Sequence, residues 1–270
     1  MFRCKQFTVA QDQCAMKVNT DSLILGSWAQ LRADLGGAPR ILDIGTGSGI
    51  LALMMAQKTE SCYSQSVNNS DNEARIDAIE IDEKAAGQAA SNFKNSKWAE
   101  LLYVHNCNVT DFTSPYFYDL IISNPPYFNS PAKLSNAYSK QSQSRSMARQ
   151  MYELDPNALF RASSKLLAES GQMYCVYPAS MEVAIVETAA VYGLLPEQIL
   201  YIKHTAEKEP YLCAFHFKKA VKSADGEPAG LTEYAVYQCS TTKNTLTIRK
   251  QEGDYTNEYK ALCEPFYLKF

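Results

Sequence analysis

Histidines are few in this sequence, and its cysteines are scattered. Only three histidines accompany the eight cysteines, and no two cysteines show the Cys-x-x-Cys spacing typical of a zinc site. We therefore expect neither a metal site nor a disulfide framework. Most cysteines are expected to be small, reduced residues of the core.

Long apolar runs and a strong net charge are also missing. No stretch approaches the ~18 uninterrupted apolar residues of a membrane span, and residues 1–7 lack the apolar region of a signal peptide. We expect a cytoplasmic protein that does not contact membranes. The net charge of −3 and the isoelectric point near 5.7 argue against a protein that coats nucleic acid through a broad positive field. A hydrophobic content of 46% in 270 residues is ample for a core.

Acidic residues are absent between Asp119 and Glu153. Within this stretch, residues 127–151 are polar and contain Tyr138 among their basic residues. A loop of this length is usually functional, and it could follow a phosphate backbone, although a merely solvated loop is the alternative. The candidate RNA contacts are Lys133, Lys140, Arg145 and Arg149.

Residues 123–127, Ser-Asn-Pro-Pro-Tyr, place several chemical functions on one stiff turn. The apolar run before them is typical of a buried parallel strand, and Pro125 and Pro126 stop that strand. Asn124 therefore follows a strand end, where open α/β sheets bind ligands. Its side-chain oxygen and the main-chain oxygen of Pro125 could accept both N–H groups of a planar amine, on which Tyr127 could stack. This chemistry suits methylation of such an amine; the alternative is a proline turn with an aromatic lid.

A strand, a glycine loop and a helix follow one another over residues 40–56. Dinucleotide sites usually show Gly-x-Gly-x-x-Gly, whereas this loop reads Gly-x-Gly-x-Gly directly after an Asp-Ile pair. That pattern better suits S-adenosylmethionine, and the absence of a following Gly-Lys-Ser/Thr excludes a P-loop. The candidate cofactor contacts are Asp43, Gly45, Gly47 and Gly49.

Three neighbouring elements supply further cofactor candidates. A second strand should end near Glu80, whose carboxylate could accept both hydroxyls of a ribose or could simply be solvated. Glu80 lies 31 residues after Gly49, an excess that matches the polar insert at residues 61–73. Asn108, after the third strand, could contact the cofactor's adenine or serve as a turn residue. Thr20 or Asp21 should N-cap a helix whose first turn could close over a cofactor.

The second half of the chain continues the alternation of helices and strands. Asp155 should cap a helix that Gly171 ends, and two later strands should pair antiparallel at the sheet edge over residues 199–217. We divide the chain into an N-terminal cofactor-closing segment, a Rossmann-like core, and a linker with a C-terminal extension packed on that core. These parts are residues 1–36, 37–220 and 221–270.

Read together, residues 42–49, Glu80 and the Asn-Pro-Pro-Tyr tetrapeptide resemble the class I S-adenosylmethionine-dependent amino-methyltransferases. The N-terminal segment with the helix near Thr20 precedes the glycine loop, and the Asn-Pro-Pro-Tyr turn follows it. Adenine-N6 methyltransferases have the same order. Residues 14–21 and the closing Pro-Phe-Tyr-Leu at 265–268 extend the resemblance, nearly end to end, to the bacterial valine-tRNA adenine-N6 methyltransferases. Members of that family modify adenine 37 beside the anticodon.

The resemblance implies an α/β fold with a seven-stranded mixed sheet flanked by helices. It also implies a monomer whose partner is the anticodon loop of a tRNA. Asn108 departs from the pattern, because relatives usually carry aspartate there, and the polar insert is unusual. The cofactor S-adenosylmethionine is assigned to Asp43, Gly45, Gly47 and Glu80. The target adenine is assigned to Asn124, Pro125 and Tyr127.

Three other interpretations remain open. A glutamine amide of a protein has the same planar N–H2 group, and enzymes that methylate it use the same tetrapeptide. Guanine-N2 methylation of ribosomal RNA is another possibility, although those enzymes usually have phenylalanine after the two prolines. The chain could also be an RNA-binding module with a vestigial cofactor pocket.

Overall fold

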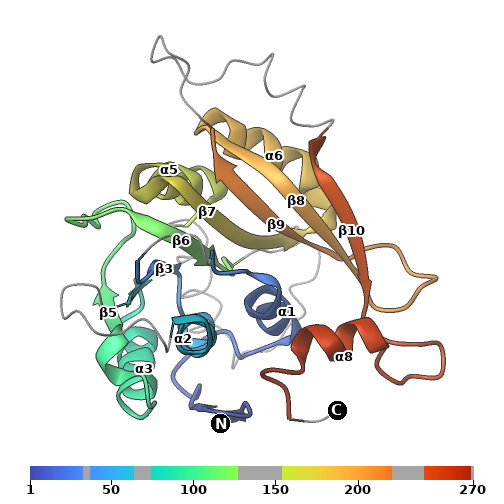
Figure 1. The fold of residues 1–270 in the computed structure, drawn as a ribbon, viewed down its shortest axis with the longest axis horizontal. Helices are drawn as coiled ribbons and strands as arrows, with labels where there is room; N and C mark the ends of the chain where they lie inside the picture. Colours follow the sequence, from blue (N-terminus) through green and yellow to red (C-terminus); the bar gives the residue numbers. More distant parts are fainter. Residues whose placement is uncertain (33–36, 64–73, 127–153, 221–239, 269–270) are drawn as a thin grey trace, which may run out of the picture.

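The computed structural model describes residues 1–32, 37–63, 74–126, 154–220 and 240–268, which build a mixed sheet with helices on both faces (Figure 1). Its eight strands run in the order β10-β8-β9-β7-β6-β3-β4-β5. Within it, β9 is antiparallel to β7 and β8, and the other neighbouring pairs are parallel. The strands are β3 (Arg40–Ile44), β4 (Arg75–Glu80), β5 (Leu102–Asn106), β6 (Tyr118–Ser123), β7 (Leu167–Pro178), β8 (Leu194–Lys203), β9 (Leu212–Lys219) and β10 (Thr242–Thr247).

The predicted α/β class and mixed sheet are confirmed, and the sheet has one strand more than the seven predicted. The additional strand is β10, which pairs parallel to β8. It forms the edge of the sheet, where the sequence predicted the antiparallel pair that corresponds to β8 and β9. A separate two-stranded sheet joins β1 (Phe2–Arg3) to β2 (Thr8–Val9).

Successive side chains of the central strands point to opposite faces of the sheet and pack in two apolar cores, one on each face. In β3, Ile41 packs in the core shared with α1, α2, α3 and α8, whereas Leu42 packs in the core shared with α5 and α6. Among the described helices, none combines the length and apolar character that crossing a membrane requires. The helices are α1 (Thr20–Trp28), α2 (Ile50–Tyr63), α3 (Glu83–Lys94), α5 (Pro156–Leu166), α6 (Glu182–Val191) and α8 (Asn257–Cys263), with 3-10 turns η1 (Ala99–Leu101) and η3 (Ala179–Met181).

Two helix ends differ from the sequence prediction. The N-cap of α1 is Asn19, one residue before the predicted Thr20, and its side chain accepts a hydrogen bond from the Ser22 amide. Helix α5 begins at its predicted cap, Asp155, but ends at Leu166 instead of continuing toward Gly171. Gly171 lies inside β7, where a Cβ atom would stand 2.9 Å from the carbonyl oxygen of Tyr118. This glycine therefore allows close strand packing and does not end the helix.

Candidate functional site

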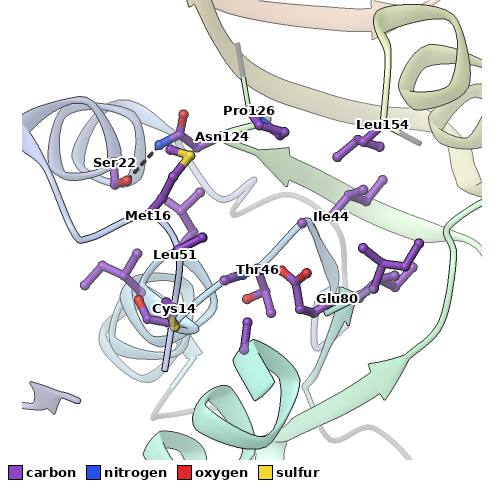
Figure 2. A pocket seen from close by; sticks show the side chains of 18 of the residues that line it. Cys14, Met16, Ser22, Ile44, Thr46, Leu51, Glu80, Asn124, Pro126 and Leu154 are labelled. Carbon is purple, nitrogen blue, oxygen red and sulfur yellow. Dashed lines mark hydrogen bonds between the residues drawn. The ribbon is translucent and has the colours of Figure 1, made fainter. Parts of the chain in front are cut away.

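A cleft opens at the carboxyl ends of the central parallel strands, where β3 and β6 end side by side and β4 ends next to β3 (Figure 2). It contains about 920 Å³ of space, part of it open to solvent. One wall is formed by residues 14–18 and Ser22 of the N-terminal segment. The glycine loop, the ends of β4 and β5, and the turn after β6 complete the lining. The cleft therefore lies at the carboxyl ends of the strands, where the sequence predicted it.

The glycine loop between β3 and α2 turns through left-handed backbone conformations. Gly45, Gly47 and Gly49 have φ values of +72°, +56° and +84°. A Cβ on Gly47 would meet no atom within 4 Å, so the backbone there faces open space at the cleft, whereas a Cβ on Gly49 would stand 2.4 Å from Phe93. Gly45 and Gly47 line the cleft, and Gly49 instead allows α3 to pack against the loop.

Asp43 lies behind the glycine loop and does not line the cleft. The carboxylate is fully buried, and its Oδ2 accepts hydrogen bonds from the Thr46 hydroxyl at 2.5 Å and from the Ala52 amide at 3.1 Å. Burial raises the pKa of Asp43 to about 7, against the effect of these two hydrogen bonds. This geometry ties the loop to the first turn of α2, so Asp43 shapes the cleft from behind.

Glu80 ends β4 and brings a buried carboxylate to the cleft wall. Its Oε2 accepts from the Gly47 amide at 2.9 Å, and its Oε1 accepts from the Asp82 amide at 3.0 Å. Burial raises its pKa, and the two backbone donors oppose that shift. Each carboxylate oxygen can accept more than one hydrogen bond, so Glu80 can still accept hydroxyl groups of a ligand in the cleft.

Asn108 lines the same cleft beyond β5, but its side chain folds back into a turn. Its Oδ1 accepts hydrogen bonds from the Thr110 amide at 3.0 Å and from the Thr110 hydroxyl at 2.9 Å. The structure thus shows the turn geometry, one of the two alternatives for this residue, and leaves the Nδ2 group as its remaining donor.

Thr20 and Asp21 begin α1 and do not line the cleft. Asp21 instead accepts a hydrogen bond from the Tyr211 hydroxyl at 2.9 Å, which joins α1 to the residue before β9. Ser22, one residue further on, does line the cleft, and the sequence analysis missed it. The available signal was a polar residue three positions after Asn19, beside the inward-facing Leu23 and Ile24.

The turn after β6 brings Asn124 to the cleft, and Pro126 also lines it. Asn124 donates from Nδ2 to the Ser22 hydroxyl at 2.8 Å, as Figure 2 shows. Its Oδ1 is buried and has no hydrogen-bond partner among the residues that the structure describes. Such a buried acceptor is costly unless a ligand satisfies it. Pro125 is buried beside it.

Several predicted site residues lie outside the described ranges. Within those ranges, no three cysteine, histidine or acidic side chains gather as a metal site would require. The predicted residues that lie outside are Tyr127, Lys133, Lys140, Arg145 and Arg149.

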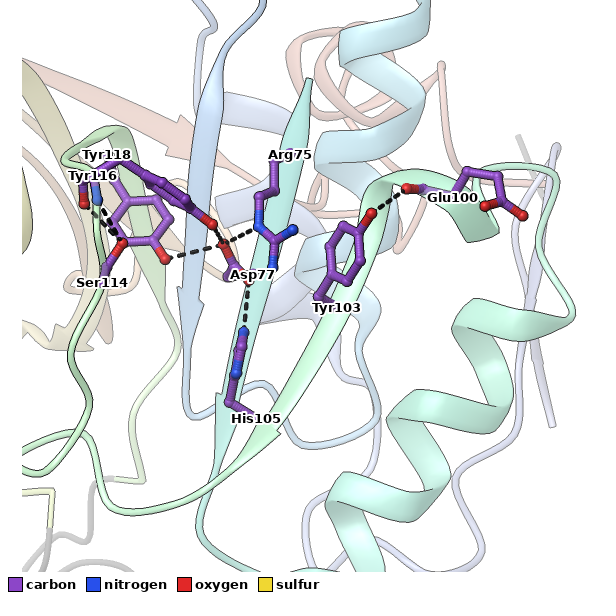
Figure 3. A network of polar contacts seen from close by, with 8 residues as sticks. All are labelled: Arg75, Asp77, Glu100, Tyr103, His105, Ser114, Tyr116 and Tyr118. Carbon is purple, nitrogen blue, oxygen red and sulfur yellow. Dashed lines mark hydrogen bonds and ion pairs between the residues drawn. The ribbon is translucent and has the colours of Figure 1, made fainter. Parts of the chain in front are cut away.

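A second polar cluster surrounds Asp77 of β4, away from the cleft (Figure 3). The Asp77 carboxylate accepts two hydrogen bonds from Arg75 at 2.9 Å each and one from the His105 ring at 2.6 Å. Hydroxyl groups of Tyr116 and Tyr118 donate to it at 2.9 and 3.0 Å. Five donors on one fully buried carboxylate form a structural network of the sheet.

Comparison with known proteins finds similarity over the whole chain. The methyltransferase small domain family matches residues 17–145. The tRNA1(Val) (adenine(37)-N6)-methyltransferase of Pseudoalteromonas atlantica is 40% identical and aligns over 100% of this chain and 98% of its own length. The protein of the same name from Tolumonas auensis is 36% identical over 99% of this chain and 97% of its own.

Solved structures show the same fold. A predicted O-methyltransferase from Agrobacterium tumefaciens superposes with a TM-score of 0.59, covering 91% of this chain and 96% of that chain at 14% sequence identity. At this low identity the superposition supports the class I methyltransferase architecture and carries no information about the substrate.

Proposed function

The chain belongs to the tRNA1(Val) (adenine(37)-N6)-methyltransferase family, and on that basis we propose that it transfers a methyl group from S-adenosylmethionine to the exocyclic N6 of adenine 37 in a valine tRNA. The observation that carries the proposal is the buried, unpartnered Oδ1 of Asn124 at the cleft, among the described residues. An acceptor in this position matches the N–H group of an adenine amine.

The residues of the cleft fit S-adenosylmethionine. Gly47 offers backbone that a ligand can approach closely, because no atom occupies the space where its Cβ would stand. Glu80 offers carboxylate oxygens that can accept ribose hydroxyls. Ile79, Ile81 and Val109 add apolar surface suited to a flat adenine ring. When bound, the cofactor supplies an electrophilic methyl group on a sulfonium sulfur.

Asn124 prepares the nucleophile. The lone pair of an exocyclic amine is delocalised into the ring, so the nitrogen is a poor nucleophile until hydrogen bonds to its N–H groups hold the lone pair out of conjugation. Asn124 Oδ1 accepts one N–H, and the main-chain oxygen of Pro125 is placed next to it in sequence to accept the other. Alkylation makes the nitrogen cationic and acidic, so its proton leaves to water without a strong base.

Residues after Pro126, which lie outside the described ranges, complete the proposed substrate site. Tyr127 would stack on the adenine, which must leave the anticodon stack to reach the cleft. The basic residues Lys133, Lys140, Arg145 and Arg149 would contact the phosphate backbone. We propose that the protein works in the cytoplasm, where its tRNA substrate is made, as a monomer without a metal.

Methyl transfer to unmodified tRNA tests the proposal. The purified protein is incubated with radiolabelled S-adenosylmethionine and, in separate reactions, with bulk unmodified tRNA, ribosomal RNA or a protein fraction. The products are digested to nucleosides or amino acids. Labelled N6-methyladenosine is the expected product. Label in methylglutamine or in methylguanosine of ribosomal RNA would identify one of the rival substrates, and cofactor binding without any transfer would indicate an RNA-binding module.

Replacing Glu80 by glutamine should weaken cofactor binding about tenfold to a hundredfold, because hydrogen bonds to a charged acceptor contribute roughly 1.5–3 kcal/mol. Isothermal titration with S-adenosylmethionine measures this change without RNA. Glu83→Gln is the matched control, since it removes the same charge from an exposed position at the start of α3. If both variants bind the cofactor like the wild type, Glu80 does not hold it.

A further inference from the structure

A continuous chain of hydrogen bonds joins α1 to Asn124 in the turn after β6. Asn124 Nδ2 donates to Ser22 Oγ at 2.8 Å, and Ser22 Oγ donates to Asn19 Oδ1 at 3.2 Å. Asn19 Nδ2 donates in turn to Asp21 Oδ2 at 3.4 Å. The Tyr211 hydroxyl completes the chain by donating to Asp21 Oδ1 at 2.9 Å.

Groups that can act only as donor or only as acceptor set the direction of this chain. The Ser22 backbone N–H is a donor and lies 3.0 Å from Asn19 Oδ1, so the oxygen of the Asn19 amide must face α1. The side chain of Asp21 offers oxygen acceptors, so the nitrogen of the same amide faces Asp21. Burial and the neighbouring Asp21 charge raise the pKa of Tyr211, which therefore stays protonated and donates.

With Asn19 oriented, the Ser22 hydroxyl has an acceptor for its single proton. It donates that proton to the Asn19 oxygen and offers its lone pairs to Asn124. The Asn124 amide faces this hydroxyl with its nitrogen, which donates to it. The acceptor oxygen of Asn124 is turned the other way, where it is buried without a partner among the described residues.

We propose that Ser22 is a positioning residue that fixes the Asn124 amide with its acceptor oxygen toward the substrate amine. This inference rests on the proposed function, because it assigns Ser22 a role in the same methyl transfer. The two ends of an amide are almost equal in shape, and a flipped Asn124 would present N–H groups to the N–H groups of the adenine. Ser22 removes that unproductive orientation before the substrate binds.

The isosteric pair Ser22→Thr and Ser22→Val tests the hydroxyl group itself. Both variants add bulk at a position that is 5% exposed, and they differ in the hydroxyl group alone. We expect Val to lower kcat for tRNA methylation by roughly tenfold to a hundredfold relative to Thr, the range typical of misplaced catalytic groups. Cofactor affinity should differ little between the two. Equal kcat values for Thr and Val would overturn the proposal.

A double-mutant cycle with Asn124 shows whether Ser22 acts through that residue. In an Asn124→Asp background both side-chain oxygens are acceptors, so the orientation of the group no longer matters. Changing Ser22 from Thr to Val should therefore alter kcat much less in this background than with Asn124 present. An equal decrease in both backgrounds would mean that Ser22 acts on something other than Asn124.

The side-chain amide signals of Asn124 provide a readout that needs no RNA. Their NMR resonances are assigned by their loss in Asn124→Asp, and in the Thr variant one amide proton should be held by the hydroxyl and protected from exchange. The Val variant should lose that protection; unchanged signals would overturn the proposal. If protection behaves as expected while the wild type forms no N6-methyladenosine, the proposed function fails and the orienting role of Ser22 stands.

Discussion

Replacing Asn124 by alanine should reduce methyl transfer to tRNA by about 10³-fold or more, while S-adenosylmethionine binding is retained. The substitution removes the buried acceptor oxygen at the cleft, and the adjoining main-chain oxygen of Pro125 can accept only one of the two adenine N–H groups. Without the second acceptor, the lone pair of the amine stays conjugated with the ring. Gly47 lies in the glycine loop and Glu80 at the end of β4; both fit the cofactor and are left in place.

The measurement is a pair of assays on the same preparation, the rate of label transfer to unmodified tRNA and the cofactor affinity by titration calorimetry. Asn95→Ala is the matched control, because it makes the same truncation at an exposed residue after α3. Near-normal turnover by Asn124→Ala would show that another group holds the amine. Equal loss of transfer and of cofactor affinity would instead place Asn124 in the cofactor site.

The cleft could be located from sequence because its parts are local. A strand followed by a glycine loop, and a strand stopped by two prolines, are patterns written in consecutive residues, and parallel strands bring their carboxyl ends to one edge. For this reason Gly47, Glu80 and Asn124 were chosen from the sequence and lie together in the structure. Strand ends and the short segments that follow them therefore fix where these residues lie.

Roles that depend on tertiary contacts could not be predicted from the sequence. Asp43 precedes the glycine loop, but only the packing of α2 shows that its carboxylate is enclosed behind that loop. Gly171 looks like a helix stop in the sequence, whereas the approach of β7 to Tyr118 explains it. Ser22 has its hydrogen-bond partner Asn124 in the turn after β6, 102 residues away in the sequence. Each of these contacts joins residues from different elements, so the spacing of neighbouring residues in the sequence does not predict it.

Asp77 is the strongest example of a residue that sequence periodicity cannot interpret. The sequence places an acidic residue between Ile76 and Ala78 in a buried strand, where an unpaired charge would be costly. Burial disfavours its ionised form, yet hydrogen bonds from His105, Arg75 and Tyr116 outweigh burial and lower the pKa of Asp77 to about 2. The carboxylate therefore stays charged and collects donors from β4, β5 and the segment that leads into β6.

Replacing Asp77 by asparagine should lower the free energy of unfolding by about 3–5 kcal/mol, because it removes the charge that satisfies Arg75 in a buried network. The new amide nitrogen would also be a hydrogen-bond donor, and it would face the donor groups of Arg75, His105 or the two tyrosines. Urea denaturation at neutral pH measures the loss. Asp111→Asn is the matched control, since it makes the same substitution at an exposed aspartate outside the buried network.

The pH dependence of unfolding tests the electrostatic origin of that loss. The pKa of Asp77 is depressed in the folded protein, so its contribution to stability is complete above the ordinary value of 3.8 and is lost as the pH falls toward 2. The difference in stability between wild type and Asp77→Asn should therefore be constant near neutral pH and shrink between pH 4 and pH 2. A difference that persists at pH 2 would assign the loss to packing, because at that pH the carboxylate of the wild type takes up its proton.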